Sequence, residues 1–147
     1  MAILNTVFLV SCVKQKRDGP SPAKLLYTSD WFHKARTYVD ASGTWWFILS
    51  AEYRLLEPER HFAPYKKTLN RMSISELLQR RTWANKVINQ LDAALPSADR
   101  IVMLAGVRYR EFLIDYMLTR ARTVEVPRQG FGIGQQLRWL KSANGQA

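Results

Sequence analysis

The chain has 147 residues, which is enough for one domain with a sizeable buried core. Hydrophobic residues make up 47%, which excludes a largely disordered chain, and no apolar run approaches the roughly 18 residues of a membrane span. The 22 lysines and arginines outnumber the 12 acidic residues, and the net charge of +10 favours a polyanionic partner such as nucleic acid. Acidic substrates or membranes would suit the same charge.

Cysteine and histidine are scarce in this sequence. Cys12 is the one cysteine, and His33 and His61 are the two histidines. A single cysteine forms no internal disulfide, and these counts supply no zinc framework. The apolar stretch from Ala2 to Val13 lacks the basic start and the cleavage site of a signal peptide, so it predicts a strand. We expect a cytoplasmic protein with no metal, no other cofactor and no membrane contact.

Short apolar runs indicate buried strands. In chain order they are Thr6 to Cys12, Thr44 to Ser50, Arg100 to Ala105 and Thr123 to Val126. Nearly continuous apolar runs of this length are typical of strands that are covered on both faces in a parallel sheet. Polar or glycine residues follow each run, which predicts a loop at each strand end.

Segments with helical spacing lie between these runs. They are Ser29 to Val39, Ser73 to Pro96, the apolar stripe Tyr109 to Met117, and Gly134 to Leu140. Ser29 is a helix-capping residue, and Ser73 followed by Glu76 resembles a capping box. The alternation predicts an α/β fold, a three-layer sandwich with a four-stranded, mainly parallel sheet. We expect one domain over residues 1–147, with a loose tail at 142–147.

Residues that follow the strands are the first candidates for a site, because ligands of open parallel sheets bind beyond the carboxyl ends of the strands. After the first strand, Ser11 and Cys12 could form a pocket floor, while Lys14 and Lys16 could face a phosphate. Their alternative is a solvated basic loop beside a buried structural cysteine.

Glu52 is the one carboxylate placed directly after a strand. A carboxylate there could position water or stabilise a cationic sugar, or it could simply pair with Arg54. Tyr27, Tyr53 and Tyr65 lie on expected loops, where they could stack on a base or pack on the core.

Glycines follow the later strands. Gly106 allows close backbone approach after the third strand, and Gly130, Gly132 and Gly134 form a turn after the fourth. Such a turn can cradle an anion, although its spacing is not the dinucleotide fingerprint. Gln135 could bind a base edge or cap a helix.

Several of these pieces recur in a distinctive order along the chain. They are Cys12-x-Lys14-x-Lys16, Ile48 to Tyr53, Pro64-Tyr65, Ala105-Gly106 with Tyr109, and Gly132 to Gln135. Together they resemble a prokaryotic and phage family of small domains of unknown function, from Ser11 to Leu140. Arg54 departs from the pattern, since the family usually has glycine at this position.

The family is distantly similar to the uracil-DNA-glycosylase-like fold. Some of its relatives act in defence against phages, as glycosylases that release glucosylated hydroxymethylcytosine. The resemblance therefore implies an enzyme that flips a modified base out of double-stranded phage DNA and leaves an abasic site.

Roles follow for the residues at the strand ends. Glu52 and Lys14 are the catalytic candidates. The expected base contacts are Ser11, Cys12, Ser50, Tyr53, Tyr65, Tyr27, Gly106, Tyr109, Gly132 and Gln135. The expected contacts to the DNA backbone are Lys16, Arg17, Arg54, Arg108 and Arg128.

Three alternatives stay open. Lys14 could instead act as a Schiff-base nucleophile with lyase activity. The protein could be a non-catalytic binder of nucleic acid, or an N-glycosidase that acts on free nucleotides. Only the functions that use a polymer need the arginine-rich helices, which include Arg80 and Arg81.

Overall fold

The computed structural model describes residues 6–12, 16–42, 45–64, 76–94, 98–126, 138–140, 142 and 144. Its elements in chain order are β1 (Thr6–Ser11), β2 (Ser21–Pro22), α1 (Ala23–Leu26), α2 (Asp30–Ser42), β3 (Trp45–Ser50), β4 (Arg54–Leu56), β5 (His61–Phe62), α3 (Leu77–Ala94), β6 (Ala98–Leu104), α4 (Val107–Arg110), α5 (Ile114–Arg120) and β7 (Ala121–Glu125).

The central sheet has five strands in the order β4-β3-β1-β6-β7. Strands β3, β1, β6 and β7 are parallel, while β4 runs antiparallel to β3. The predicted apolar runs are confirmed as the parallel strands, with ends shifted by one or two residues. The expected total of four strands is wrong, because β4 has only three residues and gives no apolar run. Strands β2 and β5 form a separate antiparallel pair.

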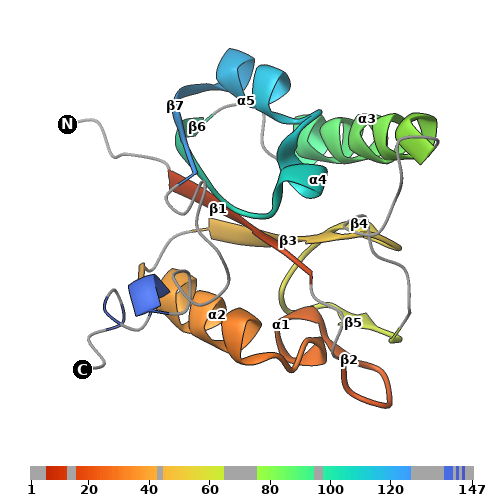
Figure 1. The fold of residues 1–147 in the computed structure, drawn as a ribbon, viewed down its shortest axis with the longest axis vertical. Coiled ribbons are helices and arrows are strands. Elements are labelled where there is room, and N and C mark those ends of the chain that lie inside the picture. The colour runs from red at the N-terminus through yellow and green to blue at the C-terminus, as the bar shows by residue number, and fades with distance from the viewer. Residues whose placement is uncertain are drawn as a thin grey trace.

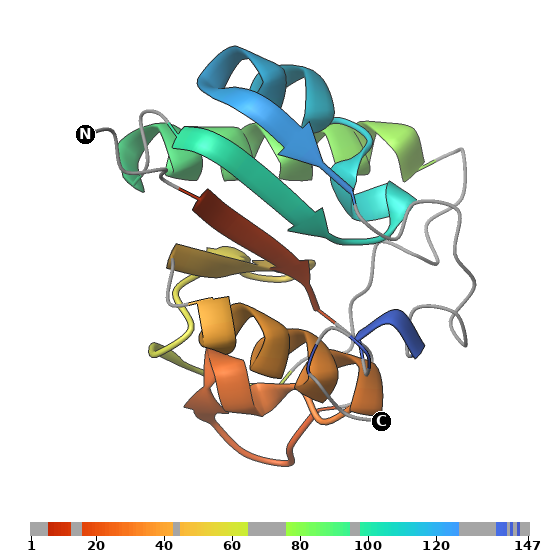
Figure 2. The same cartoon turned by 90° about the vertical axis from the view of Figure 1, so that its left-hand side faces the viewer.

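Helices cover both faces of the sheet. Helices α1 and α2 lie on one face, and α3, α4 and α5 lie on the other (Figures 1 and 2). Strand β1 lies in the middle, and all six of its residues are buried. The predicted α/β architecture, with a mainly parallel sheet between helices, is confirmed. Within the described residues, no helix has both the length and the apolar character needed to cross a membrane.

The helix predictions hold in part. Ser29 caps α2 as expected, because its Oγ accepts a hydrogen bond of 3.1 Å from the Phe32 backbone N–H. The predicted stripe from Tyr109 is divided between α4 and α5 by a turn at residues 111–113. Ser73 lies outside the described residues. Of the predicted last helix, residues 138–140 are described and helical.

A tight hairpin joins β3 to β4. Ser50 pairs with Arg54 across it, and the backbone N–H of Tyr53 donates to Ser50 Oγ at 3.0 Å. Arg54 has a φ of 68°, in the left-handed region that such hairpins ordinarily fill with glycine. The Gln90 side chain of α3 accepts from the Leu55 N–H at 2.9 Å and donates to the Leu55 carbonyl at 3.3 Å. The edge strand β4 is thereby fixed to α3.

A buried ion pair joins α3 to the segment after α4. Arg80 is only 2% exposed, and its Nε lies 2.8 Å from Glu111 Oε1. The expectation that Arg80 faces a nucleic-acid polymer is therefore wrong. A buried guanidinium needs a nearby carboxylate, because desolvation of an unpaired charge is unfavourable.

We expect Glu111→Ala to lower the free energy of unfolding by about 2 kcal/mol or more, because it leaves Arg80 with less compensation for its burial. Urea denaturation at neutral pH measures the difference. Arg122→Ala is the matched control, since the Arg122 side chain is 86% exposed and lies 3.9 Å from Asp99. That control should change the free energy by no more than about 0.5 kcal/mol. Equal losses in the two variants would contradict the structural role of the buried pair.

A second ion pair ties β7 to β6 and predicts a pH effect. The Arg100 guanidinium hydrogen-bonds both carboxylate oxygens of Glu125, which holds the Glu125 pKa below its ordinary value of 4.5. A carboxylate whose pKa is lowered by folding stabilises the fold above its unfolded pKa, and this contribution is lost as the pH falls through the folded value.

Glu125→Gln should therefore reduce stability at neutral pH, and the wild-type and variant curves should converge as the pH falls below about 4. The difference should stay under about 1 kcal/mol, because both side chains are about two-fifths exposed. Urea midpoints measured across this pH range test the expectation. Curves that stay parallel down to the lowest pH would contradict it.

Candidate functional site

Buried side chains pack together at the carboxyl ends of strands β1 and β3. Cys12 follows β1, and its Sγ lies 3.1 Å from the Tyr109 hydroxyl of α4. The Trp83 ring of α3 packs edge-on against Tyr109, with ring centroids 5.7 Å apart. Trp83 Nε1 donates to the Ser50 carbonyl at 2.8 Å. These contacts fix β1, β3, α3 and α4 relative to one another.

Burial changes the expected role of several predicted base contacts. Five of the predicted base contacts are no more than 6% exposed, namely Ser11, Cys12, Ser50, Tyr27 and Tyr109. The Tyr27 ring packs on Phe32 with centroids 4.9 Å apart, so the expectation of an open stacking surface at Tyr27 is corrected. These buried side chains pack the sheet edge and are not open to a ligand at the surface.

An open hollow lies between the β3–β4 hairpin and the first turns of α3. It has a volume of about 370 Å³, which falls in the range of about 300–1,000 Å³ that ligand pockets occupy. Its lining residues are Ala51, Glu52 and Arg54 from the hairpin, and Leu78, Gln79, Thr82, Trp83 and Lys86 from α3. The structure thus brings two of the predicted residues, Glu52 and Arg54, into one pocket.

Three charged side chains line this hollow. They are Glu52, Arg54 and Lys86. Within the part of the chain that the structure describes, none of the three side chains forms an ion pair or a hydrogen bond. Among the described residues these charges are not neutralised by a partner, so the hollow offers one carboxylate and two cations for binding.

Most other arginines in the second half of the chain have intramolecular partners. Those within 4.0 Å of a carboxylate oxygen are Arg80, Arg100, Arg108, Arg120 and Arg122. Arg110 donates to the Ala105 carbonyl at 2.8 Å. The arginine-rich second half is therefore less available to a polyanion than its count indicates.

Lys16 and Arg17 are the described basic residues that follow β1. Lys16 bridges to Tyr27, and its Nζ lies 5.7 Å from the centroid of that ring. Partial burial lowers the pKa of Lys16 below its ordinary value, while electrostatic interaction with Cys12 opposes the shift. Arg17 is exposed and donates its backbone N–H to the Leu26 carbonyl at 2.8 Å. Of these two residues, Arg17 keeps the open position expected for a contact to the DNA backbone.

Of the remaining predicted residues, some are described by the structure and some are not. Tyr53 is half-buried, with its hydroxyl donating to the Ala63 carbonyl at 3.1 Å, and Gly106 is exposed. Arg108 lies 4.0 Å from Glu111. The predicted residues that lie outside the described part of the chain are Lys14, Tyr65, Arg128, Gly132 and Gln135.

Sequence reasoning missed the helix side of the hollow. Gln79, Thr82 and Lys86 follow one another at helical spacing, so they lie on one face of α3. A polar stripe of this kind usually marks a solvated helix face. The signal that could have found it is the adjacent Trp83, an aromatic residue that packs this part of α3 against the end of β3.

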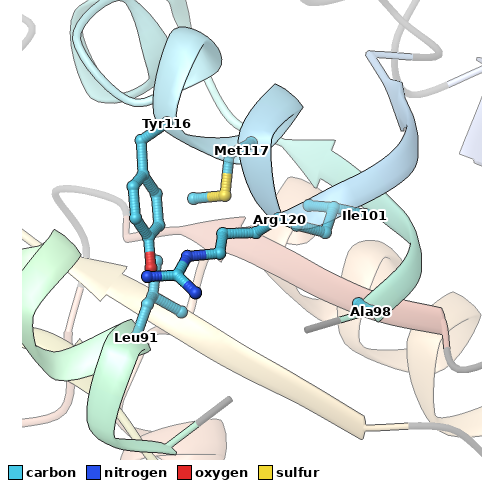
Figure 3. Close-up of a pocket in the computed structure, with 6 residues that line it drawn as sticks. All are labelled: Leu91, Ala98, Ile101, Tyr116, Met117 and Arg120. Atoms are coloured by element: carbon cyan, nitrogen blue, oxygen red, sulfur yellow. The ribbon is translucent and has the colours of Figure 1, made fainter. Parts of the chain in front are cut away.

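A second, much smaller hollow lies between α3, β6 and α5 (Figure 3). Its volume is about 10 Å³, which is room for about one water molecule. Beside it, the Tyr116 hydroxyl and Arg120 Nη2 both donate to Asp92 Oδ1, at 2.5 and 2.6 Å. Burial and the bond to Asp92 raise the pKa of Tyr116. This cluster braces α5 against α3.

Comparison with known proteins gives a family and no function. A search of curated proteins and a search of solved structures each returned no match. Among the described residues, no three His, Cys, Asp or Glu side chains gather as metal ligands would. The sequence model of DUF6884, a family of unknown function, matches residues 7–142. The chain therefore belongs to this uncharacterised family.

Proposed function

We propose that the protein is a DNA glycosylase, which flips a modified nucleotide out of double-stranded DNA and hydrolyses its N-glycosidic bond. The best candidate base is glucosylated hydroxymethylcytosine in phage DNA, and the abasic sites would serve antiviral defence. The reaction type comes from the sequence resemblance to a uracil-DNA-glycosylase-like family. The location comes from the hollow beside the β3–β4 hairpin.

One observation carries the proposal. The hollow holds Glu52, Arg54 and Lys86 without an ion pair among the described residues. Cleavage of an N-glycosidic bond places positive charge on a sugar that lies between two phosphates. A carboxylate stabilises the cationic sugar, while cations stabilise the phosphates. The mixed charge of the hollow therefore matches a nucleotide better than it matches a simple anion.

In the proposed reaction, the bond between C1′ and the base nitrogen breaks, and its electron pair leaves with the base. Water adds to C1′, and Glu52 accepts the proton that this water loses. The departing base takes up a proton from solvent. Tyr53, the expected stacking residue, packs its ring on Phe62 with centroids 4.9 Å apart and is not among the lining residues, so the proposed reaction assigns it no contact with the base.

A second candidate uses the same pocket on a free nucleotide. The intramolecular partners of Arg80, Arg100 and Arg120 favour it, because they reduce the surface charge available to a polymer. Reversing the charge of exposed Arg81 separates the two functions. Arg81→Glu should lower turnover of duplex DNA and leave turnover of a nucleoside monophosphate unchanged.

The test is incubation of the protein with phage DNA that carries glucosylated hydroxymethylcytosine, followed by an assay for abasic sites. Wild type should produce them, and Glu52→Gln should lower the rate by about 100-fold or more, because it removes the negative charge and the proton acceptor. Glu57→Gln is the matched control, since Glu57 is an exposed carboxylate of a nearby loop outside the hollow.

The result that would sink the proposal is an absence of abasic sites in every modified DNA tested. Full activity of Glu52→Gln alongside active wild type would remove only the assignment of Glu52. Borohydride trapping of a covalent complex would instead support the Schiff-base route through Lys14.

A further inference from the structure

Arg54 combines an unfavourable backbone with an available side chain. Its φ of 68° lies in the left-handed region, where glycine is unstrained and a residue with a Cβ is destabilised. Its side chain lines the hollow of about 370 Å³. Arginine therefore stands at a hairpin position where the backbone favours glycine.

Polar contacts of the Arg54 side chain do not offset this strain within the described residues. Within the described residues, the guanidinium has no ion pair and no hydrogen bond, although Glu52 is two positions away and lines the same hollow. Strained residues persist where the surrounding structure holds them in place, and they concentrate at functional sites. A role outside the fold, in ligand binding, accounts for an arginine here.

The charges of the hollow define the chemistry of that ligand. Lys86 of α3 is the second cation, and Glu52 is the one carboxylate of the lining. Two cations favour a phosphate, and a guanidinium can hold one with two parallel hydrogen bonds. The carboxylate repels the phosphate from its own part of the hollow. A ligand with a phosphate at one end and an uncharged or cationic group at the other fits this pattern.

We propose that Arg54 binds a phosphate of the nucleotide in the hollow, with Lys86 as the second cation, and so sets the orientation in which the sugar faces Glu52. The choice of a nucleotide rests on the proposed function, whereas the binding of phosphate does not. The phosphate could belong to a DNA strand or to a free nucleotide, and the binding experiment separates these two sources.

The experiment compares Arg54→Gly, Arg54→Lys and Arg122→Gln. Arg122 lies on β7, at the opposite edge of the sheet from β4, so its variant removes one positive charge far from the hollow. Binding is measured by the fluorescence anisotropy of a labelled duplex with one central mismatch, because mismatched bases flip more readily. Thermal unfolding followed by circular dichroism gives Tm for each variant.

Arg54→Gly should bind the duplex about tenfold more weakly, and the slope of log affinity against log salt should fall by about 0.9, the value for one phosphate contact. Its Tm should rise by about 2–4 °C, because relief of strain exceeds the entropy that glycine adds to the unfolded chain. Arg54→Lys should keep the charge, the strain and most of the affinity. Arg122→Gln should bind within about twofold of wild type.

Competition by deoxythymidine monophosphate and by thymidine identifies the source of the phosphate. If the monophosphate displaces the duplex from wild type and fails with Arg54→Gly, the site accepts a free nucleotide phosphate. If the monophosphate does not compete while Arg54→Gly still weakens duplex binding, the phosphate belongs to the strand. Either result supports the proposal, and thymidine should not compete.

Three outcomes overturn the proposal. They are wild-type duplex affinity of Arg54→Gly, equal losses of affinity in Arg54→Gly and Arg122→Gln, and a lower Tm for Arg54→Gly. Because binding is measured without turnover, failure of the glycosylase assay leaves this test intact. Conversely, abasic-site formation by a protein whose Arg54→Gly variant binds normally would reject Arg54 alone.

Discussion

The hydrogen bond from Trp83 Nε1 to the Ser50 carbonyl holds helix α3 against the end of strand β3. Trp83 is buried, so loss of this bond would leave an indole N–H without water to replace its partner. The same ring packs on Tyr109, whose hydroxyl meets Cys12, so one side chain links β1, β3, α3 and α4. The hollow depends on this link, because one of its walls is the hairpin after β3 and the other is α3.

Charge acts in this protein through its distribution more than through its total. The net charge of +10 indicates a polyanionic partner but gives no location for it. Ion pairs neutralise much of the arginine surface on α3, β6, α5 and β7, including Arg100 and Arg120. Arg54 and Lys86 stay without such partners among the described residues, and they share one hollow. In the proposed function, the carboxylate beside them supplies selectivity, because Glu52 disfavours a ligand that is anionic throughout.

The parallel strands could be predicted because both of their faces are buried, which requires continuous apolar sequence as in Thr6–Ser11. Strand β4 could not, since three residues held by Ser50 and Gln90 carry no periodic signal. Glu52 and Arg54 could be predicted to lie near one another at this end of the sheet because they directly follow a strand. The α3 wall was missed because polar residues at helical spacing look the same on a solvated helix and beside a pocket. Burial of Tyr27 depends on its packing against Phe32, which loop position alone does not reveal.

Stability and the proposed binding of phosphate make opposite demands at the β3–β4 hairpin. The tight turn requires a left-handed residue at position 54, and glycine meets this requirement without strain. The hollow, in contrast, gains a guanidinium only if that residue has a long side chain. Gln90 bonds both backbone groups of Leu55, which stabilises the residue next to the strained Arg54. Arg54 therefore lies between the buried Ser50 and a strand that is fixed to α3. A fixed backbone on both sides also holds the Arg54 backbone in a defined place, so binding has only the side chain to order. The same clamp therefore holds the strained backbone in place and, in the proposed binding, fixes the point from which the Arg54 side chain reaches the phosphate.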